Sequence, residues 1–185
     1  MRELLKQYSD LPILESERLI LKPLSLKFLS EKYVSWMNDE EVIRYLESGG
    51  NYTKAKLEHY LSEVEMNPKY FWAIVVKESG EHIGNIKIDP IDPIHQHGEY
   101  GIMIGDRNAW GKGIAREASS LVIDFCFMEL NLRKINLGLL ATNSAAIKLY
   151  EKLGFEQEAY FKAHVDHKGE FVDTLRMAIF NTAIK

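Results

Sequence analysis

Hydrophobic residues recur at helical spacing in several parts of the chain. In the segment 53–66, Leu57, Leu61 and Val64 fall on one face, and Thr53 is a residue type that commonly begins a helix as its N-cap. The same reasoning applies wherever apolar residues return every three or four positions. The helices predicted in this way are 27–37, 39–46, 53–66, a long helix that begins near Gly113, and 143–153.

Between these helices, β-branched and aromatic residues form short runs that end at turn residues. The run 70–77 is an example, and Ser79-Gly80 follows it as a turn. Asp89-Pro90 and Asp92-Pro93 indicate a loop, and Asp166 to Gly169 indicate a turn. The predicted strands are 18–24, 70–77, 82–88, 99–104, 134–141, 157–165 and 170–180. This order predicts an α+β fold in which helices pack on a mixed sheet.

Composition fits an ordinary globular protein. The chain has 185 residues, 46% hydrophobic and 27% charged, and this length favours one domain over residues 1–185. Lys and Arg number 23 and Asp and Glu number 27, so the formal net charge is −4. Nucleic-acid binding needs a basic surface, so this charge argues against a general nucleic-acid binder. An anionic ligand held by local positive charge stays compatible with it.

The single cysteine, the length of the apolar runs and the start of the chain indicate the cellular compartment. Cys126 has no partner for an internal disulfide, and its apolar neighbours predict a buried side chain rather than a catalytic thiol. The longest uninterrupted apolar run, Phe71 to Val76, is far shorter than the ~20 residues that span a bilayer. Residues 1–7 lack the apolar segment of a signal peptide. We therefore expect a cytoplasmic protein without a membrane partner.

The segment from Gly105 to Ala115 has the features of a phosphate-binding turn. It lies between a predicted strand and an amphipathic helix, where free N–H groups and the helix dipole favour an anion. Gly111 and Gly113 allow close approach of the backbone, and Arg107 and Lys112 add positive charge. A Walker A loop is excluded, because five residues separate Gly105 from Gly111, where that motif has four. An ordinary glycine-containing turn is the alternative.

A second segment, Ala141 to Phe155, predicts a helix that begins at Asn143 or Ser144 and ends near Gly154. Asn143 and Tyr150 are seven residues apart, so they lie nearly on one helix face. Each also has a purely structural interpretation, Asn143 as an N-cap and Tyr150 as a core aromatic. The spacing alone leaves both interpretations open.

Together, the two segments resemble the signature motifs of the GCN5-related N-acetyltransferase (GNAT) superfamily. The first family motif, (Gln/Arg)-x-x-Gly-x-(Gly/Ala), is matched over 108–113 except at its first position, where Asn108 stands beside Arg107. The second motif, Asn-x-x-Ala-x-x-Leu-Tyr-x-x-x-Gly-Phe, is matched at Asn143, Ala146, Leu149, Tyr150, Gly154 and Phe155. The two motifs are specific in combination.

Other segments are similar to the RimJ/RimL-type branch of this superfamily. They are 17–24, 36–42 and 110–118, and the whole resemblance covers about residues 15–180. The resemblance implies a single GNAT-type domain with a central, mixed, mostly antiparallel sheet of seven strands flanked by helices. It also implies that the sheet is splayed between its fourth strand, about 99–105, and its fifth, about 134–141.

In this family acetyl-CoA lies in the opening between those two strands. The resemblance implies that backbone groups of 102–104 pair with the pantetheine arm, and that one N–H there polarises the acetyl carbonyl. The amides of 109–115 would hold the pyrophosphate. The residues expected to bind acetyl-CoA are Ile102, Met103, Ile104, Arg107, Asn108, Ala109, Trp110, Gly111, Lys112, Gly113, Ile114, Ala115, Asn143, Ala146 and Tyr150.

The resemblance also implies direct acyl transfer from a thioester to an amine. Tyr150 is the expected acid that protonates the leaving thiolate, and the amine needs a base because alkyl amines are mostly protonated at neutral pH. Some members carry a glutamate at the place of Gly138, so here Glu99 is the first substitute. His97 and the acidic run Asp39 to Glu41 follow as candidates, and a chain of water molecules is a further alternative.

Metal binding is a separate question, raised by His95-Gln96-His97. Two histidines at this spacing can point the same way on a strand, but no cysteine is nearby. His164 and His167 belong to another predicted hairpin. We therefore expect no metal site.

The sequence leaves open which amine accepts the acetyl group. An amino sugar or a protein N-terminus, such as that of a ribosomal protein, is favoured, with a polyamine or an amino acid as alternatives. A non-catalytic acyl-CoA-binding module is the competing class of function. An exposed edge strand at 170–180 could pair with a second copy, so monomer and homodimer both stay open.

Overall fold

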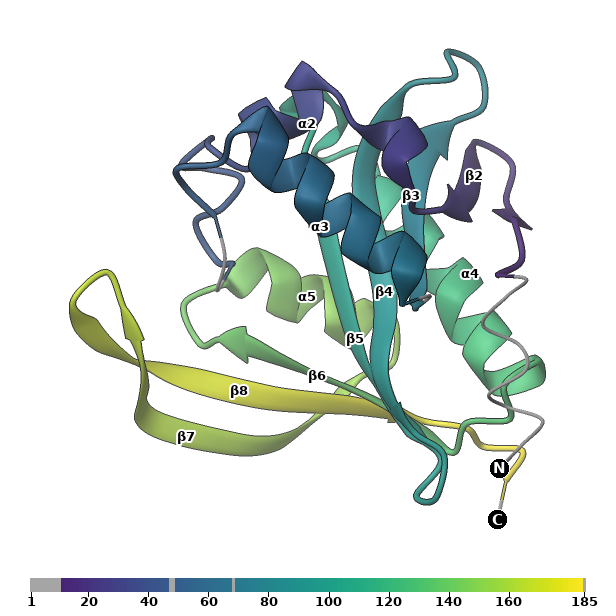
Figure 1. Cartoon of the computed structure of the whole chain (residues 1–185). Coiled ribbons are helices and arrows are strands. Elements are labelled where there is room, and N and C mark those ends of the chain that lie inside the picture. The colour runs from purple at the N-terminus through teal and green to yellow at the C-terminus, as the bar shows by residue number, and fades with distance from the viewer. Residues whose placement is uncertain (1–10, 47–48, 68, 185) are drawn as a thin grey trace. The chain divides into compact units, whose positions relative to one another are not determined.

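A computed structural model of the chain describes residues 11–46, 49–67 and 69–184 (Figure 1). The chain divides into two compact units, Met1–Asp89 with Gly101–Val122 and Pro90–Tyr100 with Ile123–Lys185. Strands β4 (His82–Asp92) and β5 (His97–Ile104) and helix α4 (Ile114–Met128) each contribute residues to both units.

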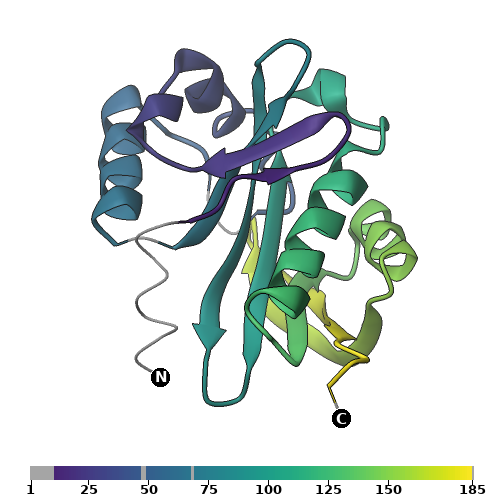
Figure 2. The same ribbon diagram turned by 90° about the vertical axis from the view of Figure 1, so that its right-hand side faces the viewer.

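The first unit is an antiparallel sheet covered by short helices. Its strands are β1 (Leu14–Glu15), β2 (Leu19–Pro23), β3 (Tyr70–Val76) and most of β4, paired in chain order. Its helical segments are η2 (Leu26–Phe28), α2 (Glu31–Trp36), α3 (Lys54–Met66), η3 (Arg107–Ala109) and the first half of α4. Helices α2 and α3 lie together on one side of these strands (Figure 2).

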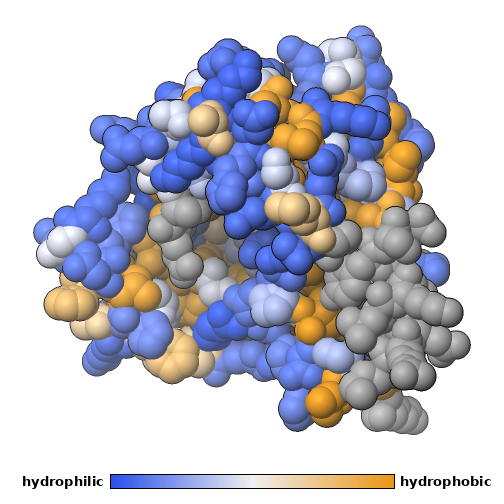
Figure 3. Space-filling model, viewed as in Figure 1, coloured by the Kyte–Doolittle hydropathy of each residue, from blue (hydrophilic) through white to orange (hydrophobic). Residues whose placement is uncertain are grey.

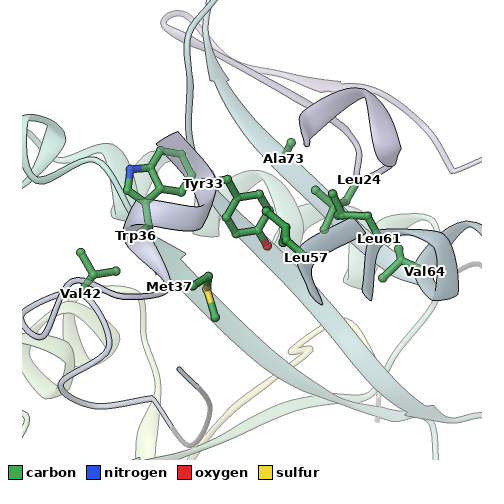
Figure 4. Packing of buried hydrophobic residues seen from close by; sticks show 9 residues of the cluster. All are labelled: Leu24, Tyr33, Trp36, Met37, Val42, Leu57, Leu61, Val64 and Ala73. Atoms are coloured by element: carbon green, nitrogen blue, oxygen red, sulfur yellow. The ribbon is translucent and has the colours of Figure 1, made fainter. Parts of the chain in front are cut away.

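A buried apolar cluster holds α2 and α3 against β3 (Figure 4). Tyr33 and Trp36 from α2, Leu57 and Leu61 from α3, and Ala73 from β3 are each no more than 5% exposed. Burial of one such large apolar side chain stabilises a fold by about 1.5–3 kcal/mol. The periodic residues that predicted helix 53–66 are thus the ones that fill this core.

The second unit contains β6 (Lys134–Leu140), α5 (Ser144–Lys152), β7 (Glu156–His167) and β8 (Glu170–Phe180). The start of β5 pairs with β6 in parallel over three residue pairs, 97–99 with 134–136. Strand β6 continues antiparallel to β8, and β8 pairs antiparallel with β7. Several apolar side chains of β7 and β8 are exposed, and Figure 3 shows apolar atoms interspersed with polar ones on one face of the molecule. These side chains are Tyr160, Phe161, Phe171 and Phe180.

The strand order is β1-β2-β3-β4-β5-β6-β8-β7, which confirms an α+β fold with a mixed, mostly antiparallel sheet. The sheet has eight strands rather than the seven predicted, because two-residue β1 adds to the predicted set. The predicted edge strand 170–180 is wrong: β8 lies between β6 and β7, and β7 is at the edge. Strands β5 and β6 pair over only three residues each, as expected if they diverge beyond that point. The opening between them stays a prediction.

Two predicted helices differ from the structure. The helix predicted at 39–46 is absent, although the Asp39 carboxylate accepts hydrogen bonds from the N–H groups of Glu41 (2.9 Å) and Val42 (3.4 Å) as an N-cap does. The helical bond from Ile43 N–H to the Asp39 oxygen, at 3.0 Å, is not continued, because Leu46 N–H donates to the Ile43 oxygen three residues back, at 3.0 Å. The helix predicted at 27–37 is divided into η2 and α2, because Ser30 caps α2 by accepting from Tyr33 N–H at 3.1 Å.

The loop predicted at Asp89-Pro90 and Asp92-Pro93 is also wrong in part, because β4 extends through Asp92. Pro90 is exposed, so the N–H group that proline lacks does not leave a buried backbone hydrogen bond unmade. Other local predictions are confirmed. Thr53 caps α3 by accepting from Lys56 N–H at 3.2 Å, and Gly169 (φ 86°) lies in the turn between β7 and β8.

Cys126 is fully buried, as its neighbours predicted, and burial raises the pKa of its thiol. Such a thiol stays protonated and unreactive. Across the residues that the structure covers, none of the helices combines the length and the apolar character that crossing a membrane requires.

We expect Gly84→Ala to destabilise the first unit, because a Cβ at Gly84 would lie 2.3 Å from the backbone oxygen of Met103. Backbone cannot move aside as a side chain can, so the free energy of unfolding should fall by about 1–3 kcal/mol in urea denaturation. The control is Gly101→Ala, where the new Cβ meets only the flexible side chain of Lys87, at 3.2 Å. Equal losses in both variants would contradict this interpretation.

Candidate functional site

The predicted phosphate-binding turn has a helix N-terminus with free amides. Gly111 and Gly113 have φ values of 72° and 77°, a left-handed conformation that glycine adopts without strain. The Glu117 N–H donates to the Gly113 oxygen at 3.1 Å, which makes Gly113 the N-cap of α4. The N–H groups of 114–116 precede that bond and have no acceptor within the helix. The turn therefore presents a row of donors suited to an anion.

Arg18 anchors this turn from the start of β2. Its Nη1 donates to the Lys112 backbone oxygen at 3.1 Å, and its Nε donates to Glu117 Oε2 at 2.7 Å. Ser16 Oγ donates to the other Glu117 oxygen at 2.7 Å. Burial raises the pKa of the Glu117 carboxyl, but the hydrogen bonds from Ser16 and Arg18 outweigh it, so the pKa is lowered. No sequence pattern indicates this role of Arg18, which lies 94 residues from Lys112.

The two cations predicted for the turn differ in their surroundings. Arg107 Nη1 lies 3.5 Å from Asp39 Oδ2, so its charge is shared with a carboxylate. Lys112 is exposed and has no ion pair with any residue that the structure describes. Trp110 Nε1 donates to the Ile104 oxygen at 2.8 Å, which ties the turn to the end of β5.

The end of β5 carries the predicted backbone contacts of the pantetheine arm. The backbone of Met103 passes close to Gly84 of β4, and the N–H groups of Gly105 and Asp106 both donate to the Ile83 oxygen, at 2.9 and 3.0 Å. The Ile104 oxygen is already taken by Trp110. The Ile104 carbonyl, one of the backbone groups predicted to pair with the ligand, therefore already has an intramolecular partner.

A cavity of about 710 Å³ opens beside the turn within the first unit, a size in the usual range for small-molecule sites. The turn supplies part of its wall, and the rest comes from residues just before β2, from the end of β3, from the turn between β3 and β4 and from the start of β4. The turn residues that line it are Asp106, Asn108, Ala109, Lys112 and Ile114. The predicted phosphate-binding turn is thus accessible from this side.

In the second unit, Asn143 and Tyr150 lie on α5 as predicted. Asn143 Oδ1 accepts from Ala146 N–H at 3.2 Å, so Asn143 is an N-cap; its amide NH2 has no partner among the described residues. Tyr150 is 8% exposed, with its ring 5.8 Å from that of Tyr100 and 5.6 Å from that of Phe155. Burial raises the pKa of the Tyr150 phenol to about 12. The phenol therefore holds its proton throughout the neutral range.

Glu99 is part of a polar network in the second unit. Arg176 donates to both carboxylate oxygens, at 2.8 and 2.6 Å, and Asn136 Nδ2 donates to one of them at 2.6 Å. A Cβ on Gly138 would lie 2.9 Å from Arg176 Nη1, so the glycine makes room for this arginine.

The remaining candidates for the base lie in other surroundings. Asp39 faces Arg107, and Glu41 faces Arg44 at 3.5 Å. His97 lies at the start of β5, with its Nε2 3.9 Å from Asp92 Oδ2. The structure thus brings the turn and the β5 end together in the first unit, and Glu99, Asn143 and Tyr150 belong to the second.

Comparison with known proteins gives the family. The sequence model of the acetyltransferase (GNAT) domain matches residues 18–156, which include parts of both units. An N-acetyltransferase 9-like protein of Caenorhabditis briggsae is 30% identical over 143 residues, 72% of each chain. The spermidine N(1)-acetyltransferase of Escherichia coli is 35% identical over 106 residues, 57% of this chain and 56% of that protein.

The chain also spans 60% of an uncharacterised N-acetyltransferase, p20, of Bacillus licheniformis, at 35% identity. Among solved structures, a GNAT-family acetyltransferase from Bacillus anthracis superposes with a TM-score of 0.82 at 23% identity, over 92% of this chain and 99% of that one. Spermidine N-acetyltransferase from Vibrio cholerae, in complex with CoA and spermine, gives 0.79 at 26% identity over 90% and 98%. By its motifs, its strand order and this family match, the chain belongs to the GNAT acetyltransferase family.

Proposed function

We propose that this protein moves an acetyl group from acetyl-CoA to a primary amine by direct transfer. The observation that carries the proposal is the helix N-terminus at Gly111 to Arg116, whose free amides and left-handed glycines suit a diphosphate, in a chain of the GNAT family. The family match includes residues of both compact units, which supports one acetyltransferase domain over 1–185. No metal takes part in this proposed reaction.

For acetyl-CoA we propose the contacts that the family resemblance implies. The amides of 109–115 hold the pyrophosphate, Lys112 adds charge, and the backbone of 102–104 pairs with the pantetheine arm. Asn143 has a free amide NH2 to offer, beside Ala146 on the same helix. Arg107, Asn108 and Trp110 complete the set from the turn, where Asn108 replaces the Gln or Arg usual in the family.

The proposed transfer needs a base for the amine proton and a hydrogen-bond donor for the leaving thiolate. The amine nitrogen bonds to the acetyl carbonyl carbon, the carbon–sulfur bond breaks, and the amine proton leaves to a base. Tyr150 donates a hydrogen bond to the leaving sulfur. Because the pKa of its phenol is about 12 and that of an ordinary thiol is about 8.5, full proton transfer to the thiolate is uphill. Tyr150 therefore acts chiefly by stabilising the developing negative charge.

For the base we propose Glu99, acting on the amine directly or through water. Two carboxylate oxygens offer about four acceptor positions, and Arg176 and Asn136 fill three of them, so one position stays available. That remaining position is where the amine or a bridging water molecule would donate its hydrogen bond.

The acceptor we propose is an amino sugar or a protein N-terminus, within a cytoplasmic RimJ/RimL-like enzyme that is a monomer or a homodimer. A polyamine is the alternative that the spermidine N-acetyltransferases among the relatives favour. Nucleic acid and membrane are not among the proposed partners. Near the first-unit helices, Glu40 is an exposed carboxylate without an ion pair in the described part of the chain, and so is suited to attract a cationic amine.

The acceptor class can be tested by thiol release from acetyl-CoA with a panel of amines. The panel holds glucosamine, a peptide with a free N-terminal alanine, spermidine and free amino acids, and mass spectrometry identifies the product. We expect amine-dependent release with at least one member. Binding of acetyl-CoA without release by any amine would favour the non-catalytic acyl-CoA-binding module.

Tyr150→Phe should lower kcat by about 10²-fold, the usual cost of removing one hydrogen bond that stabilises transition-state charge. KM for acetyl-CoA should change less than about threefold, because the ring and its packing remain. The wild-type rate should not fall between pH 7 and pH 10 through ionisation of Tyr150, since its pKa is about 12. Tyr160→Phe, which removes an exposed phenol on β7, is the control and should keep full activity.

Glu99→Gln should lower kcat and remove the acid limb of the pH–rate profile that Glu99 produces as a base. The control is Glu158→Gln, which breaks another strand-to-strand ion pair of the same unit, with Lys134 Nζ at 2.5 Å. An acid limb that is unchanged in Glu99→Gln would remove Glu99 as the base and leave the water chain.

A further inference from the structure

The hairpin between β4 and β5 brings together three side chains with metal-ligating atoms. Asp92 ends β4, His97 begins β5, and His95 lies in the turn between them. Asp92 Oδ2 is 2.8 Å from His95 Nδ1 and 3.9 Å from His97 Nε2, and the three ligand atoms all lie within 4.8 Å of one another.

The turn itself fixes the orientation of the carboxylate. Asp92 Oδ1 accepts hydrogen bonds from the N–H groups of Ile94 and His95, both at 2.9 Å, so Oδ2 is left to face the imidazoles. Metal ligands are commonly held in this way by hydrogen bonds to their second atom. The site therefore has a preformed carboxylate rather than a freely rotating one.

The tip of the hairpin is also attached to the neighbouring strand. Gln96 has a left-handed φ of 52°, and its oxygen accepts from the N–H groups of Arg133 at 2.7 Å and Lys134 at 3.2 Å. The rings of His95 and His97, on either side of it, are stacked at 6.2 Å with an interplanar angle of 25°. Both imidazoles are thus presented on the same side of a restrained backbone.

These separations are close to those between neighbouring ligand atoms on one metal ion. Bonds of about 2.0–2.1 Å at tetrahedral or octahedral angles place neighbouring ligand atoms roughly 2.9–3.4 Å apart. The two distances to Asp92 Oδ2, 2.8 and 3.9 Å, fall on either side of that range. Rotations of exposed imidazoles are enough to bring all three atoms onto one ion.

We propose that Asp92, His95 and His97 form a binding site for a first-row transition-metal dication of the Zn²⁺ class. Two imidazole nitrogens and one carboxylate oxygen suit Zn²⁺, Ni²⁺, Co²⁺ or Cu²⁺, whereas Mg²⁺ and Ca²⁺ prefer sites made of oxygen alone. Water completes the coordination, because the side chains are partly exposed. The proposal is independent of the acetyl transfer, since none of the three residues is proposed to bind acetyl-CoA.

The proposal replaces the expectation of no metal site. The sequence pattern predicts a loop at Asp92-Pro93, whereas in the structure Asp92 ends β4 and its Oδ2 lies 3.9 Å from His97 Nε2. His164 and His167 belong to the β7–β8 hairpin.

The test uses the full chain without a purification tag, stripped with EDTA, and titrated with ZnCl2 by calorimetry. The matched variants are His95→Ala, His97→Ala and Asp92→Asn; the last removes the charged ligand but keeps an Oδ1 that accepts the two backbone hydrogen bonds. We expect one Zn²⁺ per chain in the wild type and at least tenfold weaker binding in each histidine variant. His164→Ala, which alters an exposed histidine elsewhere, should bind like the wild type.

Absorption of bound Co²⁺ gives a second readout, because its visible bands report nitrogen and oxygen ligands and should disappear in His97→Ala. Circular dichroism of each variant establishes that the fold is retained. Wild-type binding weaker than about 100 µM, or equal affinity in the wild type and the variants of Asp92, His95 and His97, would overturn the proposal. Loss of binding in His164→Ala alone would overturn it as well.

Discussion

The interaction on which the phosphate-binding turn depends is the contact of Arg18 with Glu117 and with the Lys112 oxygen. Gly111 and Gly113 supply the backbone conformation, but they have no side chains with which to hold it. Arg18, just before β2, stabilises this conformation through its hydrogen bonds, and Ser16 donates a hydrogen bond to the other Glu117 oxygen. A carboxylate in the first turn of α4 is also favoured by the helix dipole. The row of free amides is therefore set by a contact between segments far apart in the chain.

This contact reduces the positive charge near the turn that is available to a ligand. Arg18 and Arg107 both have carboxylate partners, Glu117 and Asp39, so much of their charge is balanced before any ligand arrives. Lys112 and the backbone amides then supply most of the attraction for an anion. A site that depends on backbone donors tolerates Asn108 at a motif position where the family usually has Gln or Arg, because that side chain is one contact among several.

The elements that sequence predicts well are those whose causes are local. Helix α3 follows from Thr53 and an apolar face, and the turn before α4 and the Asn143–Tyr150 spacing lie within short segments. The single helix predicted at 27–37 is wrong because the Ser30 side chain caps α2 and so separates it from η2. The network around Glu99 joins residues 77 positions apart, and the Arg18 anchor joins residues 99 apart. No local pattern contains such pairs.

The pair of Gly138 and Arg176 bears directly on the chemistry. A Cβ at position 138 would lie 2.9 Å from Arg176 Nη1, so this guanidinium would have to shift if the glutamate that some family members carry stood there. Here the carboxylate that we propose as the base is Glu99, which is paired with Arg176. Arg176 and Asn136 fill three of the roughly four acceptor positions of Glu99, so one position is left for a proton donor in the proposed reaction. An acceptor with a lower amine pKa, such as an α-amino group at about 8, loses its proton more easily than an alkyl amine at about 10, and so depends less on that one position.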